Sequence, residues 1–307
     1  MAIDARYFYG EALTLPQCTG IALIILRVIY ISLPATLCVA AGGWSSRLMH
    51  PLKTSAINIS QRLFRPLGFR ATRTVAGHKF VFDPATDIGM QLLFMGGFEE
   101  KAIMQCAQFI RPDGMVIDVG ANIGLHAVRF AQVAKAGKVI CFEPARSTFA
   151  FLLQNVKDVP NVVPLNIALS DSNGLQNFFV AADNAFSGLK DTKRKPILRQ
   201  EAVACFAGDA ILQPLVQDQR VDLIKIDVEG LETQVLGGMK EFIARHRPVI
   251  FCEIFGGKQS NPDPQATVEL CIAFGYDPFV LKAGQLVVAR EHDDEFNDYF
   301  LIPRQRN

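Results

Sequence analysis

The residues best suited to chemistry in this chain are an acid and two glycines in the pattern Asp118-x-Gly120-x-x-x-Gly124. They follow the apolar run Met115–Val119, typical of a buried parallel strand, and they precede a helical pattern. Such a turn exposes the first N–H groups of the helix, and a glycine lets a ligand approach the backbone. Dinucleotide sites use G-x-G-x-x-G instead, and this acid suits a cationic ligand better than a phosphate. The alternative is an ordinary packing turn.

A second acid, Glu143, ends the next apolar run, Lys138–Phe142, and Pro144 stops the strand after it. In a doubly wound sheet this strand lies beside the first. We therefore expect the Glu143 carboxylate to reach the ribose of a bound nucleoside and to accept hydrogen bonds from both hydroxyls. A solvated charge at a strand end is the weaker alternative, because Glu143 is paired in the pattern with Asp118.

A third group of acids follows two later apolar runs. The run Val221–Ile226 is predicted to deliver Asp227 and Glu229 to the same carboxyl edge, where open α/β sheets bind ligands. Glu253 lies near the end of the following run. Acids gathered beside a cationic ligand need a cation or a proton to hold them, and Lys225 is the expected partner.

Three further residues have weaker assignments. Asp171 lies in the turn after a predicted strand over 162–169, where it would meet an adenine amino group, although it is equally a typical turn acid. Glu99 belongs to the segment Gly97–Glu100, which either covers the bound nucleoside or begins a helix with an acidic first turn. His126 is a secondary candidate for a general base.

The alternation of apolar runs with helical patterns predicts an α/β domain built on a doubly wound sheet. The segment 183–195 is expected to be an exposed loop, with basic residues that are solvated or that meet an anionic substrate or lipid headgroup. The residues after 290 look like a short tail. The other expected elements are a hairpin over 70–83, a helical stretch over 86–110 broken at Gly96-Gly97, helices over 125–134, 146–157, 231–245 and up to 274, a strand over 175–181 and a final hairpin over 276–290.

The composition argues against several classes of protein. With 31 basic and 30 acidic residues in 307 the formal net charge is +1, so no nucleic acid is expected as the main partner. The seven cysteines form no C-x-x-C pair and the five histidines show no ligand spacing. We therefore expect a reducing compartment, without a disulfide framework or a metal site.

The N-terminal part of the chain is a separate case. The run Gly20–Gly42 has the length of a membrane span, but Arg27 and Pro34 interrupt it. The basic flank that follows would place the rest of the chain in the cytoplasm by the positive-inside rule. The sequence thus predicts a hydrophobic helical segment over 1–65 and one catalytic domain over 66–307. The segment either anchors the chain at the inner face of a membrane or packs as a helix pair on the domain or in a dimer.

Several ordered motifs together make residues 85–290 resemble the FkbM family of S-adenosylmethionine-dependent methyltransferases. The resemblance implies a class I methyltransferase fold, with a Rossmann-like sheet of seven strands whose final strand is antiparallel. It also implies O-methylation of hydroxyls on sugars, glycolipids or polyketides. The motifs are Phe98-Glu99, Ile117–Gly124, Phe142-Glu143-Pro144, Asn166–Asp171, Ile224–Glu232 and Glu253.

On this resemblance S-adenosyl-L-methionine is the expected cofactor, and a small molecule or a glycan- or lipid-linked hydroxyl is the expected acceptor. Methyl transfer from a sulfonium depends chiefly on alignment and on exclusion of water, but the hydroxyl must still lose its proton. We assign Asp227 as the base, with Glu229 and Glu253 positioning the acceptor. The expected cofactor-binding residues are Glu99, Asp118, Gly120, Asn122, Gly124, Glu143, Asp171 and Asp227.

Three other interpretations remain open. A nicotinamide-dependent oxidoreductase is disfavoured by the missing G-x-G-x-x-G pattern. A catalytically inactive, methyltransferase-like interaction module held at a membrane is disfavoured because the motif acids and glycines are all present. A metal-assisted methyltransferase would bind Mg²⁺ through Asp227, Glu229 and Glu253, and EDTA would inhibit it.

Overall fold

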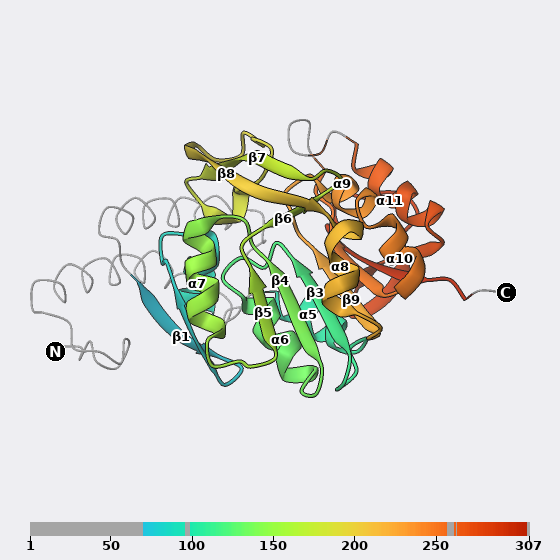
Figure 1. Ribbon diagram of the computed structural model, residues 1–307, viewed down its shortest axis with the longest axis horizontal. Helices are drawn as coiled ribbons and strands as arrows, with labels where there is room; N and C mark the ends of the chain where they lie inside the picture. The colour runs from blue at the N-terminus through green and yellow to red at the C-terminus, as the bar shows by residue number, and fades with distance from the viewer. Residues whose placement is uncertain (1–69, 96–98, 257–260, 262, 306–307) are drawn as a thin grey trace, which may run out of the picture. The chain divides into compact units, whose positions relative to one another are not determined.

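The computed structural model describes residues 70–95, 99–256, 261 and 263–305, and these form an α/β fold (Figure 1). The chain divides into two compact units, with residues 75–80 and all described residues from 99 onward in the second. The hydrophobic run Gly20–Gly42 lies outside the described residues. Across the described ranges no helix is both long and apolar enough to cross a membrane. The predicted boundary between residues 65 and 66 stays a prediction.

The first elements agree with the predicted hairpin and broken helix. Strands β1 (Ala71–Val75) and β2 (His78–Phe82) form a two-stranded sheet. Helix α4 (Asp87–Met95) is separated from α5 (Glu100–Ala107) by the segment that contains the two glycines. Glu99 is the N-cap residue of α5 and has a positive φ of 48°.

Five parallel strands form the centre of the main sheet in the order β5-β4-β3-β9-β10 (Figure 1). Every residue of β3 and β9 is buried, as expected for strands that are covered on both faces. The bounds of the five strands are Val162–Leu165 for β5, Lys138–Phe142 for β4, Met115–Val119 for β3, Val221–Ile226 for β9 and Val249–Glu253 for β10.

The sheet has eight strands rather than the seven that the resemblance implies. Strand β11 (Tyr276–Lys282) and strand β12 (Gln285–Val288) form the predicted hairpin, and β12 adds the eighth strand at the edge. The expected tail after residue 290 is wrong. Residues Asp298–Pro303 form β13, which lies between β10 and β11 and is antiparallel to both, so the final strand is antiparallel as expected.

The predicted third strand over 162–169 is two strands in two sheets. Strand β5 pairs with β4, whereas β6 (Ala168–Ser170) joins a three-stranded sheet in the order β6-β8-β7. Asn166 lies at the break, and its side-chain Nδ2 donates to the backbone oxygens of Glu143 and Pro144. These bonds hold Asn166 beside the residues that follow β4, at the point where the chain passes from the main sheet to the three-stranded sheet. Strand β7 (Gly174–Ala181) confirms the predicted strand, and β8 is Ile197–Ala207.

The predicted helix over 231–245 is divided into α9 (Glu232–Gly237) and α10 (Lys240–His246). Gly238 lies at the division, and a Cβ there would come within 1.9 Å of the backbone oxygen of Ser170. The new helix start is capped from outside, because the Asp209 carboxylate accepts hydrogen bonds from the backbone N–H groups of Glu241 and Phe242.

Helices pack on the sheet through alternate strand residues. Side chains of α8 (Gly208–Val216), α9, α10 and α11 (Pro264–Ala273) share one apolar cluster with Met115, Ile117 and Val119 of β3. Helix α6 (Leu125–Val133) contacts β3, β4 and β5, and α7 (Arg146–Val156) contacts β5. The intervening β3 residue Asp118 lies outside that apolar cluster and is fully buried.

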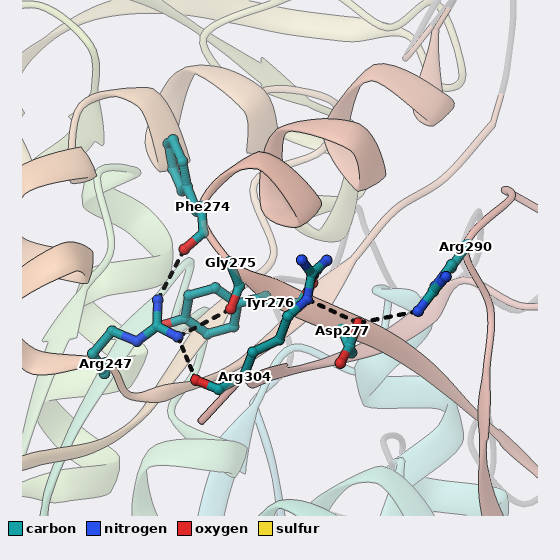
Figure 2. A network of polar contacts seen from close by, with 7 residues as sticks. All are labelled: Arg247, Phe274, Gly275, Tyr276, Asp277, Arg290 and Arg304. Carbon is teal, nitrogen blue, oxygen red and sulfur yellow. Dashed lines mark hydrogen bonds and ion pairs between the residues drawn. The ribbon is translucent and has the colours of Figure 1, made fainter. Parts of the chain in front are cut away.

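A polar network holds the last strands together (Figure 2). The Arg247 guanidinium donates to the backbone oxygens of Phe274, Gly275 and Arg304 at 2.9, 3.0 and 2.9 Å. Its carbon lies 5.0 Å from the centre of the Tyr276 ring. Asp277 pairs with Arg304 at 3.0 Å and with Arg290 at 3.7 Å. The half-buried Arg247 therefore links the residues that follow α11 to Arg304, the residue that follows β13.

Candidate functional site

An open cavity of about 620 Å³ lies where β3, β4 and β9 end. This is the carboxyl edge at which open α/β sheets bind ligands. The loop between β7 and β8 forms the opposite wall. The lining residues are Val119, Gly120, Asn122, Phe142, Glu143, Pro144, Ile167, Ala168, Leu169, Phe178, Asn184, Ala185, Ser187, Gly188, Leu189, Asp227, Val228, Glu229 and Leu231.

Both motif glycines adopt positive φ angles, but their neighbours are protein atoms rather than open space. Gly120 has φ 78°, and a Cβ there would lie 1.8 Å from the backbone oxygen of Asp227. Gly124 has φ 90°, and a Cβ would lie 2.7 Å from a methyl carbon of Leu152. The glycines are thus required by close packing of the turn against β9 and α7, in addition to the backbone conformation.

Glu143 is held at the end of β4 by two backbone donors. Its Oε1 accepts from the N–H of Ala145 at 2.9 Å, and its Oε2 accepts from the N–H of Asn122 at 3.0 Å. The side chain is buried apart from its cavity-facing edge, with the residue 6% exposed. Burial raises the pKa of Glu143 to about 7, against the lowering effect of the two N–H groups. Each oxygen keeps a lone pair for a further donor.

Lys225 joins the ends of β3 and β9, as the sequence suggested. Its Nζ lies 3.3 Å from Asp118 Oδ1 and 3.4 Å from Asp227 Oδ2, and it donates to the Gly120 oxygen at 2.7 Å. Lys225 is 2% exposed. Burial acts to lower the pKa of Lys225, but Asp118 and Asp227 outweigh it, so its pKa is raised and the ammonium stays charged.

The two acids beside Lys225 differ in access. Asp118 is fully buried, and within the described residues its carboxylate oxygens accept no hydrogen bond. A ligand in the cavity would respond to the charge of Asp118 without touching it. Asp227 lines the cavity, and 29% of its side chain is exposed. Asp227 is therefore the acid of this pair that can contact a bound molecule.

The β7–β8 loop is not the fully exposed segment that the sequence suggests. Asp183 is completely buried and caps a short 3-10 helix, η2 (Asn184–Phe186), by accepting from the N–H of Ala185. Thr192 is also buried. The Asn184 side chain donates to Asn122 Oδ1 at 3.0 Å, which joins the loop to the glycine turn.

Arg194 is a candidate that the sequence did not single out, because nothing distinguishes it there from the other basic residues of segment 183–195. Its Nη1 lies 2.6 Å from Glu229 Oε2. Its guanidinium carbon lies 4.3 Å from the centre of the Phe186 ring and 4.8 Å from that of Phe255. Burial and then Asp227 raise the pKa of Glu229 to about 8, while Arg194 acts to lower it.

Further acids lie beside Asp227 but do not line the cavity. Burial, followed by Asp227, raises the pKa of Glu253 well above its usual range. Its register partner on β13, Asp298, has a pKa raised to about 6, chiefly by burial and then by Glu99. Glu99 Oε2 lies 3.2 Å from His126 Nε2. The sequence could not single out Asp298, because it lies in the segment expected to be a tail.

The described residues bear on two further points. Asp171 is exposed at the end of β6 and is not among the residues that line the cavity, so its contact with an adenine stays a prediction. Across the described ranges no group of three or more His, Cys, Asp or Glu side chains has an arrangement that could hold a metal ion.

Comparisons with known proteins relate this chain to methyltransferases. A family model described as the methyltransferase FkbM domain matches residues 118–278. The 2-O-methyltransferase NoeI of Sinorhizobium fredii is 28% identical over 150 residues, which cover 45% of this chain and 62% of that protein. The hexuronic acid methyltransferase AglP of Haloferax volcanii is 30% identical over 142 residues, which cover 46% of this chain and 56% of that protein.

A solved structure of a methyltransferase FkbM from Methylobacillus flagellatus is also similar, with a TM-score of 0.41 and 14% identity. The match covers 89% of this chain and 59% of that one. This likeness is too distant to inform the chemistry. The matched region of the chain spans 62% and 56% of the lengths of the two curated relatives.

Proposed function

The chain belongs to the FkbM methyltransferase family, whose cofactor is S-adenosylmethionine, and on this premise we propose that it methylates a hydroxyl of a sugar-type acceptor. The observation that carries the proposal is the cavity at the carboxyl edge of the sheet. It is bounded by the Glu143 carboxylate on one strand and by Asp227 on another. A nucleoside-binding acid and a candidate base thus face the same space.

The side chains present fit this cofactor. Three carboxylates line the cavity, those of Glu143, Asp227 and Glu229, and they suit a ligand that carries a positive charge and hydroxyl donors. Bound S-adenosylmethionine supplies an electrophilic methyl group on a sulfonium. Glu143 would accept hydrogen bonds from the ribose hydroxyls, and the buried charge of Asp118 would favour the cationic end.

Asp227 is the best placed base among the three acids assigned to catalysis. It lines the cavity, is partly exposed, and forms an ion pair with Lys225 that fixes its position. Glu229 also lines the cavity, but it is already paired with Arg194. Glu253 lies beside Asp227 but does not line the cavity, so it is placed to hold Asp227 rather than to receive the acceptor proton. Asp227 would take the proton from the hydroxyl as the oxygen attacks the methyl carbon.

The class of acceptor is inferred from the relatives. Two of them carry names that specify a 2-O-methyltransferase and a hexuronic acid methyltransferase. A sugar hydroxyl is therefore the acceptor that we propose for this chain. Glycolipid and polyketide acceptors, and anchoring at a membrane through residues 20–42, remain predictions that the described residues do not test. A catalytically inactive interaction module is the alternative function.

Titration calorimetry and a transfer assay on the full-length chain test the proposal. We expect S-adenosylmethionine to bind with micromolar affinity and to transfer labelled methyl to members of a panel of monosaccharides and uronic acids. Glu143→Ala should weaken cofactor binding about tenfold or more, because ribose hydroxyls lose a charged acceptor. Glu269→Ala, on the exposed face of α11, is the matched control.

A folded wild-type chain that binds no S-adenosylmethionine would contradict the proposal. Binding without transfer to any acceptor of the panel would favour the inactive interaction module.

A further inference from the structure

Arg194 has more donors than the structure uses. A guanidinium carries five N–H donors, and the contact with Glu229 is a single one, from Nη1 to Oε2 at 2.6 Å. The bidentate arrangement that arginine usually makes with a carboxylate is not formed. About a third of the side chain, 31%, is exposed beside the cavity residue Glu229, so the remaining donors are open to solvent.

The guanidinium is held in a fixed plane. The centres of the Phe186 and Phe255 rings lie 4.3 and 4.8 Å from its central carbon, and the two residues come from different segments, η2 and the stretch after β10. Stacking on aromatic rings favours arginine over lysine and removes much of the side-chain freedom that a ligand would otherwise have to restrict.

The loop that presents Arg194 is itself fixed. Phe179 and Gly188 exchange two backbone hydrogen bonds, of 2.8 and 3.2 Å, which pin the loop against β7. The Ser187 hydroxyl oxygen accepts from the N–H of Ala181 at 3.0 Å. Asp183 caps the turn from a buried position. Arg194 is therefore presented by an ordered loop. It does not itself line the cavity, but it contacts Glu229, which does.

The segment that carries Arg194 is basic, whereas the cavity beside it is lined by acids. Segment 190–195 carries four basic residues and one acid, and Lys195 Nζ lies 5.0 Å from the centre of the Phe186 ring. The cavity residues Glu143, Asp227 and Glu229 are all acidic. The acids can accept hydrogen bonds from the hydroxyls of a neutral acceptor. An acceptor that carries a carboxylate also needs a cation near the cavity to pair with that carboxylate.

We propose that Arg194 is a specificity-determining residue that binds the carboxylate of an acidic sugar acceptor. The proposal rests on the proposed function and narrows its acceptor from sugars in general to sugars that carry a carboxylate. Glu229 occupies one N–H of the guanidinium and orients it, and the acceptor carboxylate takes the donors that remain. Because Glu229 is two residues from Asp227, the anchored sugar presents its hydroxyls beside the base.

The test compares two acceptors that differ only at carbon 6, methyl α-D-glucuronide with a carboxylate and methyl α-D-glucoside with a hydroxymethyl group. We expect the wild-type full-length chain to show a higher kcat/KM for the glucuronide. Arg194→Met should lower the ratio of the two kcat/KM values by about 10- to 100-fold, the usual worth of a hydrogen-bonded charge pair. Arg194→Lys should retain part of the preference, since it keeps the charge but loses the planar fork.

Lys193→Met is the matched control, because Lys193 is exposed and pairs with Asp191 in the same loop. We expect it to leave the ratio unchanged. Calorimetric titration of both sugars into the chain saturated with S-adenosylhomocysteine supplies a readout that does not depend on turnover. The glucuronide should bind more tightly, and the difference should disappear in Arg194→Met.

Equal losses for both acceptors in Arg194→Met would overturn the inference, because they would mean that Arg194 acts only through Glu229. So would a wild-type chain that binds the cofactor but binds neither sugar, or binds both equally. In each of those cases the specificity fails, while cofactor binding together with transfer to another sugar of the panel would still uphold the proposed function. Absence of cofactor binding by the wild-type chain would instead remove the proposed function itself.

Discussion

Two polar networks in this chain centre on a cation, and they differ in what surrounds it. Arg247 faces three backbone oxygens, and the nearby Asp277 has two arginines (Figure 2). Lys225 faces two carboxylates, and its charge also acts on Glu99 and Glu253. In the first network the arginine donors find neutral backbone acceptors or one opposite charge. In the second, carboxylates outnumber the buried cation.

The difference separates a structural network from a functional one. Neutral carbonyls around Arg247 fix the position of strands and leave no proton to move. The excess of carboxylates around Lys225 can be held only by protons or by an incoming positive charge. A cationic cofactor supplies the positive charge, and a hydroxyl that loses its proton supplies the proton. The Arg247 network has no such excess of carboxylates, so we assign it a structural role.

The largest effect is expected at Lys225. Lys225→Met would leave Asp118 and Asp227 without their cation in a buried site, and removing one partner of a buried pair costs about 3–5 kcal/mol. Guanidinium unfolding of the full-length chain should show this loss. Lys240→Met, on the exposed face of α10, should change the unfolding free energy little. The distinction between the two networks would be wrong if Lys225→Met lowered the unfolding free energy no more than Arg247→Met does.

The next effect concerns rate rather than stability. Asp227→Asn removes the proposed base and should lower kcat by about 10²- to 10⁴-fold, the usual contribution of general-base catalysis. The affinity for S-adenosylmethionine, measured by calorimetry, should stay within about threefold, because the proposed ribose contact is at Glu143. Asp218→Asn, whose side chain is 99% exposed, is the control. Full turnover in Asp227→Asn would exclude the base role.

A smaller effect, of stability alone, is expected at Arg247. Arg247→Met removes three charge-assisted bonds to backbone oxygens that water can partly replace, and the expected loss is about 2 kcal/mol. Cofactor affinity should not change. Arg245→Met, at an exposed position of α10, provides the matched control. A change in cofactor affinity in Arg247→Met would mean that the two networks are coupled, and would end the distinction between them.

The smallest effect is a pH dependence at Glu143. Its pKa of about 7 in the folded chain means that the carboxyl is mostly protonated at pH 6 and mostly ionised at pH 8. Only the ionised form offers both oxygens as full acceptors to ribose hydroxyls, so the affinity for S-adenosylmethionine should rise about tenfold between these values. In Glu143→Gln the calorimetric affinity should be nearly independent of pH, while Glu269→Gln should behave as wild type.

The same pKa also predicts a stability trend. Glu143 has a folded pKa above its ordinary value of 4.5, so the native state holds the proton more tightly than the unfolded state. The stability from this group is complete below about pH 4.5 and is lost as the pH rises through about 7. Glu143→Gln should flatten the unfolding free energy over this window. An unchanged slope would mean that Glu143 is ionised throughout.

The sequence by itself determined the elements that begin the site. The apolar runs before Asp118, Glu143 and Asp227 predicted β3, β4 and β9, because strands buried on both faces must be continuously apolar. Their acids and glycines then fell at one edge, since parallel strands end together. Lys225 was predicted as the partner of the acids because only a cation or protons can hold them.

Only the tertiary structure decided which further residues reach that edge. Asp298 arrives through β13, a strand that pairs between β10 and β11 and has no neighbour in sequence to indicate it. Arg194 lies in a basic loop and forms an ion pair with Glu229. Asn166 lies where one apolar run is divided between two sheets. Each depends on a contact between distant segments. Local patterns record how a segment buries its own side chains, whereas such contacts are fixed only when the whole sheet is assembled.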